Sequence, residues 1–199
     1  MNNTTLNYYN ANAQEFVQGT VYVDFHITQD RFLAQLPAGA KILDFGCGSG
    51  RDTKYFLERG FAVEATDGSA ELCKLASEHT GISVKQMLFD ELDAVAKYDG
   101  IWACASILHL GWADLVVVMR KMVRAVKGEG VIYTSFKYGH FTGERNGRFF
   151  TDLDEEGLAR LLKEVGGLEV KELWITGDVR PGRGEEKWLN VLLTKRCFR

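Results

Sequence analysis

Three glycines at alternating positions, in the segment KILDFGCGSGRDT, are the feature of the sequence with the clearest chemical meaning. Gly46, Gly48 and Gly50 lie between an apolar run and a helix-like run, and Asp44 precedes them. Glycine inside regular structure costs about 0.5–1 kcal/mol relative to alanine. Three of them therefore indicate a tight turn or the close approach of a ligand. Cys47, inside the loop, is expected to fill space rather than to act as a nucleophile.

The spacing of this loop argues against two phosphate-binding motifs. A P-loop needs Gly-Lys-Ser/Thr after its first glycine, but Arg51 follows Gly50 and no Lys-Ser/Thr pair comes next. The dinucleotide fingerprint G-x-G-x-x-G would place its third glycine at position 51, not at Gly50. The Asp44 carboxylate would also repel a pyrophosphate, whereas it suits a ligand that carries an ammonium group. A nicotinamide oxidoreductase is therefore disfavoured.

A second acidic residue supports a ligand with a ribose. Asp67 ends the next apolar segment and is followed by a turn that starts at Gly68. An acid at this place accepts hydrogen bonds from ribose hydroxyls in dinucleotide folds. The loop and the acid together predict an adenosine with a cationic tail, a description that S-adenosylmethionine (SAM) fits.

The elements that would position these residues alternate along the chain. Helices are expected at residues 7–18 and 30–36, before the glycine loop. From Lys41 strands and helices alternate, and the last two strands form a hairpin around the turn-rich segment DVRPGRGEEK. The expected strands are 41–46, 61–67, 83–89, 98–106, 130–137, 168–177 and 188–195. The expected helices between them are 51–60, 69–81 (capped by Ser69 and stopped by Gly81), 113–128 and 153–167 (capped by Thr151 or Asp152).

This alternation predicts an α/β fold, a Rossmann-like seven-stranded and mostly parallel sheet with helices on both faces. The last strand is expected to be antiparallel. Ligands of such sheets bind beyond the carboxyl ends of the strands, where the glycine loop lies. Residues 1–199 are expected to form one domain, with residues 1–36 as a helical cap and residues 37–199 as the core.

Bulk composition limits the classes of partner. The chain has 199 residues, a net charge of −3 and a pI of about 5.8, so no global basic field favours nucleic acid. Its four cysteines have no metal-ligand spacing. With no signal peptide and no apolar run long enough to span a bilayer, a cytoplasmic protein with a small-molecule substrate, no membrane contact and no metal is expected.

The glycine loop, the acid that ends the second strand and the closing hairpin resemble the class I SAM-dependent methyltransferases. The resemblance covers the chain from Lys41 onward, and within the superfamily it is strongest to small tellurite-resistance-type methyltransferases. It implies that Asp44 and the glycines bind the methionine part of SAM, and that Asp67 binds the ribose. It also implies that Phe89 and Asp90 flank the adenine, although LFDELD offers several acids. The segment ACASILHL, which includes Ala105, would face the transferred methyl group, and S-adenosylhomocysteine (SAH) would be the product.

Few residues have to act in the chemistry itself, because methyl transfer needs mainly alignment and exclusion of water. His109 is the best candidate for a general base, and packing beside the cofactor is the equal alternative. Tyr8 or Tyr9 could cover the sulfonium with an aromatic face, or could merely pack the N-terminal helix.

Two polar segments near the strand ends suggest where an acceptor enters. They carry a set of basic residues that would suit an anionic acceptor, although solvated charge is the simpler interpretation: Lys137, His140, Arg145, Arg148, Arg180 and Arg183. No Asp/Asn-Pro-Pro-aromatic motif of nucleobase or glutamine methylation follows the fourth strand. The sequence thus predicts a methyltransferase for a small acceptor. The alternative is a SAM-binding sensor or partner-binding protein without turnover.

Overall fold

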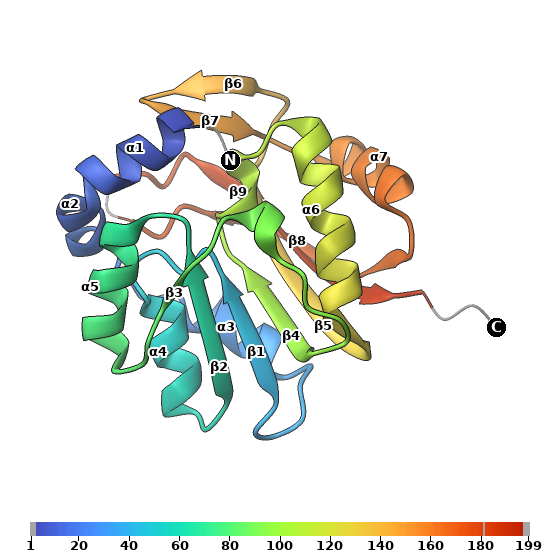
Figure 1. The fold of residues 1–199 in the computed structure, drawn as a ribbon. Coiled ribbons are helices and arrows are strands. Elements are labelled where there is room, and N and C mark those ends of the chain that lie inside the picture. Colours follow the sequence, from blue (N-terminus) through green and yellow to red (C-terminus); the bar gives the residue numbers. More distant parts are fainter. Residues whose placement is uncertain (1–2, 181, 197–199) are drawn as a thin grey trace.

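The computed structural model, which describes residues 3–180 and 182–196, has one seven-stranded sheet at its centre (Figure 1). The strand order is β3-β2-β1-β4-β5-β9-β8. Strands β1 to β5 pair in parallel, and β9 pairs antiparallel with both β5 and β8. This confirms the predicted Rossmann-like sheet with its C-terminal hairpin. The strands are β1 (Lys41–Phe45), β2 (Ala62–Asp67), β3 (Lys85–Gln86), β4 (Tyr98–Ala103), β5 (Val126–Lys137), β8 (Leu168–Gly177) and β9 (Lys187–Lys195).

Helices cover both faces of the sheet because successive strand residues point to opposite sides. In β1, Ile42 packs on one side with the core of α3 and α4, and Leu43 packs on the other with α6 and α7. Helix α5 lies on the α3–α4 side (Figure 1).

No helix among the described residues is long and apolar enough to cross a membrane. The helices of the two faces are α3 (His26–Leu33), α4 (Arg51–Glu58), α5 (Ala70–Thr80), α6 (Trp112–Ala125) and α7 (Glu155–Val165).

Several boundaries differ from the sequence prediction. The first helix begins earlier and is interrupted at Asn12, giving α1 (Asn3–Ala11) and α2 (Ala13–Gln18), while α3 also starts earlier than predicted. Strand β3 has only two residues. Ser69 and Gly81 bound α5 as predicted, but the prediction of a Thr151 or Asp152 cap on α7 was wrong.

The cap of α7 is Asp154, whose side chain accepts a hydrogen bond from Gly157 N at 2.8 Å. Thr151 is unavailable because it ends a strand and its hydroxyl donates to the carbonyl of Leu110. Asp152 is unavailable because it is paired with Arg145. Both residues lie too far back along the chain, in or next to a hairpin that the sequence analysis did not predict.

That hairpin consists of β6 (Thr142–Arg145) and β7 (Arg148–Thr151), within the segment treated above only as a polar loop. Its turn residues, Asn146 and Gly147, have φ values of +49° and +73°. Positive φ at both central residues is the requirement of a type I′ turn, for which Asn-Gly is the strongest sequence signal. The Asn-Gly pair could therefore have revealed the hairpin.

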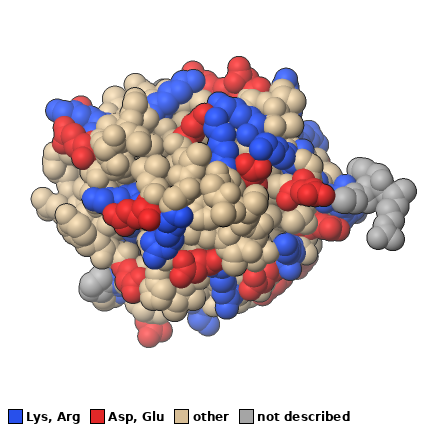
Figure 2. All heavy atoms as spheres, turned by 90° about the horizontal axis from the view of Figure 1, so that it is seen from below, with Lys and Arg blue, Asp and Glu red and all other residues tan. Residues whose placement is uncertain are grey.

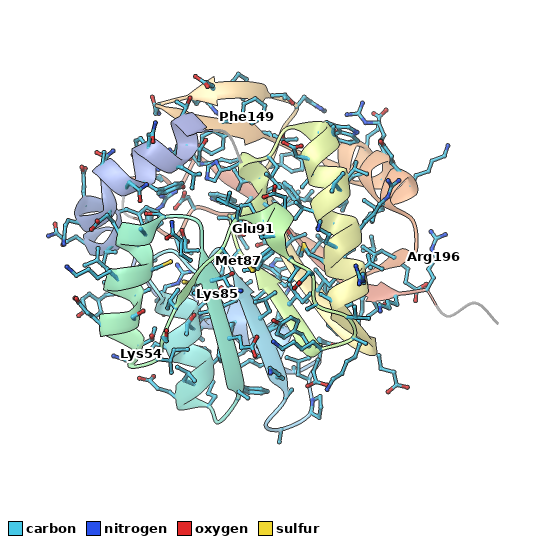
Figure 3. All side chains as sticks on the ribbon, viewed as in Figure 1. Lys54, Lys85, Met87, Glu91, Phe149 and Arg196 are labelled. Atoms are coloured by element: carbon cyan, nitrogen blue, oxygen red, sulfur yellow. The ribbon has the colours of Figure 1, made fainter. Side chains whose placement is uncertain are left out.

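The hairpin and the first two helices lie at the same end of the sheet, the end to which the parallel strands point (Figure 1). Phe149 of β7 lies at this end (Figure 3), and its backbone N–H donates to Thr5 Oγ1 of α1 at 3.0 Å. Segments that are 144 residues apart thus form one layer over the strand ends. On the opposite face, seen from below in Figure 2, basic and acidic side chains are interspersed.

Candidate functional site

A cavity of about 1280 Å³, open solvent at its mouth included, lies between the carboxyl ends of the strands and the overlying layer. Loops after β1, β2 and β4 form one wall. Helices α1 and α2, strand β7 and the β8–β9 connection form the other. A cavity at the point where parallel strands end is where open α/β sheets bind ligands. It also brings together residues from almost the whole length of the chain.

The three glycines have different functions in the loop between β1 and α4. All three have positive φ, +84° at Gly46, +56° at Gly48 and +77° at Gly50. A Cβ at Gly46 would lie 2.6 Å from Ser106 Cβ, and one at Gly50 would lie 2.8 Å from a methyl of Thr80. Gly46 and Gly48 line the cavity. Gly50 instead permits the close packing of α4 on α5.

Asp67 lies at the end of β2 and lines the cavity with Gly68. Its two carboxylate oxygens accept hydrogen bonds from the backbone N–H groups of Gly48 and Ser69, each at 2.9 Å. These bonds connect the acid to the glycine loop and fix its orientation. Burial raises the pKa of Asp67, while the same backbone N–H groups lower it. Lone pairs remain on both oxygens for hydroxyl groups of a ligand.

Asp44 does not line the cavity. Its carboxyl group is buried and accepts a hydrogen bond from Thr53 Oγ1 of α4 at 2.5 Å. Burial and the nearby charge of Asp52 raise the pKa of Asp44. In this structure the residue therefore anchors the loop to α4, and a direct contact with an ammonium group stays a prediction that its placement does not support.

Arg51 and Asp52, which the sequence analysis did not assign to the site, line the cavity beside the loop. Nε and Nη2 of Arg51 donate to the two oxygens of Asp52, at 2.7 and 3.0 Å. Asp52 is buried and also accepts from Gln29 Nε2 and Trp102 Nε1. The Arg51 guanidinium lies over the ring of Phe25 at 4.6 Å. The sequence signal for this pair is an arginine directly after a glycine loop.

Tyr9 of α1 and His109 of the turn after β4 form a hydrogen-bonded pair on the cavity wall. The Tyr9 hydroxyl lies 2.9 Å from His109 Nε2, and His109 Nδ1 lies 2.6 Å from the carbonyl oxygen of Phe149. A carbonyl only accepts, so Nδ1 of the neutral imidazole carries the proton and Nε2 accepts from Tyr9. Both side chains that the sequence singled out for chemistry thus contact each other.

The protonation states of the pair follow from burial. Burial lowers the pKa of His109 to about 4, with the charge of Arg148 acting in the same direction and the bond to Phe149 opposing it. Burial also raises the pKa of Tyr9, against the effect of Arg148. Both groups are therefore neutral at pH 7. Because Tyr9 already donates to Nε2, the imidazole reaches a substrate only through the tyrosine hydroxyl or after that bond opens.

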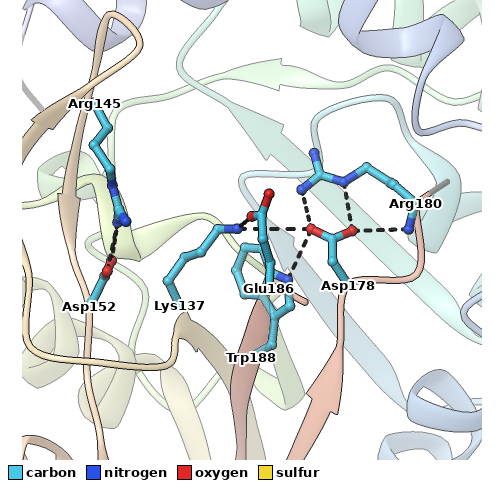
Figure 4. Close-up of polar contacts among 7 residues, drawn as sticks. All are labelled: Lys137, Arg145, Asp152, Asp178, Arg180, Glu186 and Trp188. Carbon is cyan, nitrogen blue, oxygen red and sulfur yellow. Dashed lines mark hydrogen bonds and ion pairs between the residues drawn. The ribbon is translucent and has the colours of Figure 1, made fainter. Parts of the chain in front are cut away.

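Several basic residues of the predicted rim are already neutralised by carboxylates (Figure 4). Arg180 donates to both oxygens of Asp178, and Trp188 Nε1 donates to the same carboxylate at 3.2 Å. Lys137 forms ion pairs with Glu186 and with Asp178. Burial lowers the pKa of Lys137 to about 8, against the effect of Asp178. Arg180 and Lys137 line the cavity as paired charges.

Of the other residues predicted for the site, some line the cavity and some lie outside it. Phe89 and Ala105 line the cavity, and Ala105 has a φ of +49°, with its N–H donating to Ser135 Oγ. Asp90 is exposed and outside the lining. His140 and Arg145 also lie outside it; His140 is solvent-exposed near Asp154, and Arg145 pairs with Asp152.

The buried thiols and the acidic residues offer no further reactive group. Cys47 and Cys104 line the cavity, and burial raises the pKa of both thiols, so they are protonated at neutral pH. Within residues 3–180 and 182–196, no group of three His, Cys, Asp or Glu side chains could hold a metal ion. Cys197 lies outside the described residues.

Comparison with known proteins agrees with this geometry. Residues 42–130 match a family model described as a methyltransferase domain. A Bacillus subtilis protein named as a candidate methyltransferase, YqeM, is 28% identical over 135 residues, which are 62% of this chain and 53% of that protein. A malonyl-[acyl-carrier protein] O-methyltransferase of Pectobacterium atrosepticum is 32% identical over 107 residues, 52% of this chain and 42% of that enzyme. The chain thus spans about half or less of the length of these relatives.

Solved structures match over almost the whole chain. A Burkholderia thailandensis 1,6-didemethyltoxoflavin-N1-methyltransferase, with bound 1,6-didemethyltoxoflavin and SAH, has a TM-score of 0.80 and 22% identity, covering 96% of this chain and 87% of its own. A TehB-like SAM-dependent methyltransferase of Corynebacterium glutamicum has a TM-score of 0.69 and 20% identity, covering 96% of this chain and 99% of its own. At these identities the likeness concerns the fold. The sheet order and these structures show the Rossmann-like fold of class I SAM-dependent methyltransferases, and residues 42–130 match a methyltransferase domain.

Proposed function

We propose that the protein is a SAM-dependent methyltransferase that acts on a small, anionic acceptor. The observation that carries the proposal is the position of Asp67, whose carboxylate is fixed by two backbone N–H groups at the end of β2 and faces the cavity beside the glycine loop. An acceptor-only group held in this way suits the two hydroxyls of a ribose. The solved relative that holds both SAH and a small molecule supports an acceptor of similar size.

The residues on this side of the cavity fit the parts of SAM. Asp67 would bind the ribose, and Phe89, with Gly68 and Leu72 nearby in the lining, would contact the adenine. Arg51 uses Nε and Nη2 for Asp52, which leaves Nη1 for the carboxylate of the methionine part. Asp44 lies outside the cavity lining and would hold the loop in place through its hydrogen bond with Thr53 of α4. SAM supplies an electrophilic methyl group when it is bound here.

The chain itself contributes to the transfer by positioning the reactants and by excluding water from them. In the reaction the lone pair of the acceptor atom forms the new bond to the methyl carbon, and the electron pair of the broken carbon–sulfur bond goes to sulfur. Tyr9, Phe16 and Phe150 line the cavity with aromatic surface that would exclude water from the bound reactants. Tyr9 and His109 can accept a proton from an acceptor that must lose one.

Calorimetric titration with SAM, SAH and NADH tests the proposal, with an Asp67→Asn variant and Asp114→Asn as the matched control. Asp114 is an exposed carboxylate in the first turn of α6, outside the cavity lining. Loss of a charged acceptor for hydroxyl groups costs about 1.5–3 kcal/mol, so Asp67→Asn should weaken SAM binding about 10- to 100-fold. Asp114→Asn should leave SAM binding unchanged.

The outcomes separate the readings of the site. Binding of SAM and SAH but not NADH, with the predicted loss in Asp67→Asn, supports the cofactor site. Wild-type affinity in Asp67→Asn would remove this residue from the ribose. Tight NADH binding without SAM binding would refute the proposal. SAM binding without methyl transfer to any member of a panel of thiols, carboxylates, amines and chalcogen oxyanions would favour the sensor alternative.

A further inference from the structure

Arg148 of β7 differs from the other buried basic residues in the cavity wall. It lines the cavity next to Tyr9, His109 and Phe150. Its Nε is buried and has no hydrogen-bond partner, and no carboxylate of the described residues lies within 4.0 Å of its guanidinium. The guanidinium is held by rings instead, with Cζ 4.4 Å from the centroid of Tyr8 and 5.4 Å from that of Phe150.

The other buried cations of the cavity have carboxylate partners. Arg51 pairs with Asp52, Arg180 with Asp178, and Lys137 with Asp178 and Glu186. Arg183, at the mouth, is exposed, so water solvates its charge. Within the described residues, Arg148 is therefore the one partly buried cation of this cavity that faces it without a counter-charge.

A guanidinium in this setting favours an anion from outside the chain. Removing a charge from water is costly unless it is paired and hydrogen-bonded. Stacking on Tyr8 and Phe150 offsets only part of that cost and leaves Nε without a hydrogen-bond partner.

We propose that Arg148 is the anion-binding residue of the acceptor subsite, and that it takes a carboxylate attached to an aromatic or otherwise flat body. A guanidinium presents two parallel N–H groups that match the two oxygens of a carboxylate. Tyr9, Phe150 and Trp188 supply flat apolar surface in the lining of the same cavity. This inference rests on the proposed function, since it assigns the acceptor half of the same cavity.

The position of Arg148 also explains its neighbours. The Tyr9–His109 pair is neutral and adjacent, so it places a hydroxyl group rather than a second charge beside the anion. Asp67 lines the same cavity but belongs to the glycine-loop wall, whereas Arg148 belongs to the overlying layer. Asp67 and Arg148 thus lie in different walls, which orients a ligand pair made of a cationic donor and an anionic acceptor.

The test measures binding of three carboxylates and their uncharged amides to the SAH-saturated protein by calorimetry. The probes are benzoate, phenylacetate and 3-phenylpropionate, each against its own carboxamide. The variants are Arg148→Met, which keeps the apolar stem, and Arg148→Lys, which keeps the charge but not the fork. Arg183→Met is the matched control, because it removes an exposed arginine from the same cavity.

We expect at least one carboxylate to bind wild type about tenfold or more tightly than its amide. Arg148→Met should abolish that preference, Arg148→Lys should retain part of it, and Arg183→Met should change it less than twofold. The proposal is overturned if no carboxylate is preferred over its amide, or if Arg148→Met keeps the preference. It is equally overturned if Arg183→Met abolishes the preference as fully as Arg148→Met does.

Titration of SAH alone into each variant separates this inference from the proposed function. If SAH binds wild type and Arg148→Met alike while carboxylate preference is absent, the cofactor site stands and the acceptor assignment fails. If SAH does not bind wild type, the proposed function itself fails. Circular dichroism of Arg148→Lys and Arg148→Met reports whether each variant is folded, so loss of structure is not mistaken for loss of binding.

Discussion

Replacing His109 by asparagine tests the central geometry of the site through the pH dependence of stability. His109 is buried with 3% of its surface exposed, its Nδ1 donates to the Phe149 carbonyl, and its Nε2 accepts from Tyr9. Asparagine can keep a donor near the Nδ1 position but cannot be protonated. The variant therefore removes the titrating group while it retains one of the two hydrogen bonds.

The magnitude follows from the difference between the folded and unfolded pKa values of this histidine. The pKa of His109 is about 4 in the folded protein, against an ordinary value of 6.5. A base with a depressed pKa when folded stabilises the fold fully above the unfolded pKa, and this stabilisation is lost as the pH falls from 6.5 toward 4. The whole effect is about 3 kcal/mol, and about 2 kcal/mol of it is lost between pH 7 and pH 5.

The assay is urea unfolding of wild type and His109→Asn at pH 7, 6 and 5. The free energy of unfolding of wild type, minus that of the variant, should fall by about 2 kcal/mol over this range. Taking the difference cancels other groups, including Asp44 and Asp67, whose raised pKa values act with the opposite sign. His140→Asn is the control, because it makes the same substitution at an exposed histidine outside the cavity lining.

A flat difference for His109→Asn between pH 7 and pH 5 would refute the reasoning. It would mean that His109 is solvated or paired with an acid in solution, and that the neutral Tyr9–His109 pair does not form. A constant offset between the two proteins would not matter, because losing the Tyr9 hydrogen bond destabilises the variant at every pH. Only the slope tests the burial of a neutral imidazole.

Two further substitutions test the frame that holds the cavity. Gly46→Ala should destabilise the fold by about 2–4 kcal/mol, because a Cβ there lies 2.6 Å from Ser106 Cβ at a positive φ. Gly60→Ala is the control, because Gly60 has a similar φ but a Cβ there would meet nothing within 4 Å. It should cost about 1 kcal/mol in the same urea assay. Asp52→Asn should destabilise the fold by about 3–5 kcal/mol, because it leaves the buried guanidinium of Arg51 unpaired. An Arg51→Met/Asp52→Asn double variant lacks that unpaired charge and should be more stable than Asp52→Asn alone. A double variant that is no more stable would contradict this reasoning.

The fold could be predicted because local signals and global topology agree. Apolar runs, each bounded by a glycine or a cap, alternate with helical patterns from Lys41 onward. Such alternation favours a parallel sheet with helices packed on its faces. Ser69 and Gly81 bound α5 as predicted, since a cap and a left-handed stop are local interactions. Strand β3 was predicted too long because an apolar segment alone does not specify how many residues find a pairing partner.

The site was predictable only where its residues follow directly from a strand end. Asp67 and Gly48 lie on the cavity because the sheet itself places them there. Asp44 and Gly50 belong to the same pattern but face α4 and α5, and which way each points depends on packing that spacing does not encode. Likewise, Tyr9 contacts His109 across 100 residues of sequence.

Charge pairing was the least predictable property, and it changes the interpretation of the predicted rim. In the sequence Arg145, Arg148 and Arg180 are equivalent basic residues near strand ends. In the structure Asp152 and Asp178 neutralise two of them. A count of charges therefore overstates the attraction for an anion, whereas the pairing scheme leaves Arg148, of these three described arginines, without a carboxylate partner.

Local sequence motifs determine one wall of the cavity, and long-range contacts determine the other. The loops after β1, β2 and β4 are fixed by the sheet, so the wall assigned to SAM depends on short local motifs. The other wall is built from α1, α2, the β6–β7 hairpin and the β8–β9 connection, which meet only through long-range contacts such as that between Phe149 and Thr5. Substitutions in these segments can alter the acceptor while the glycine loop is unchanged. Acceptor specificity in this protein is therefore to be sought in residues such as Tyr9 and Arg148, and not in the glycine loop.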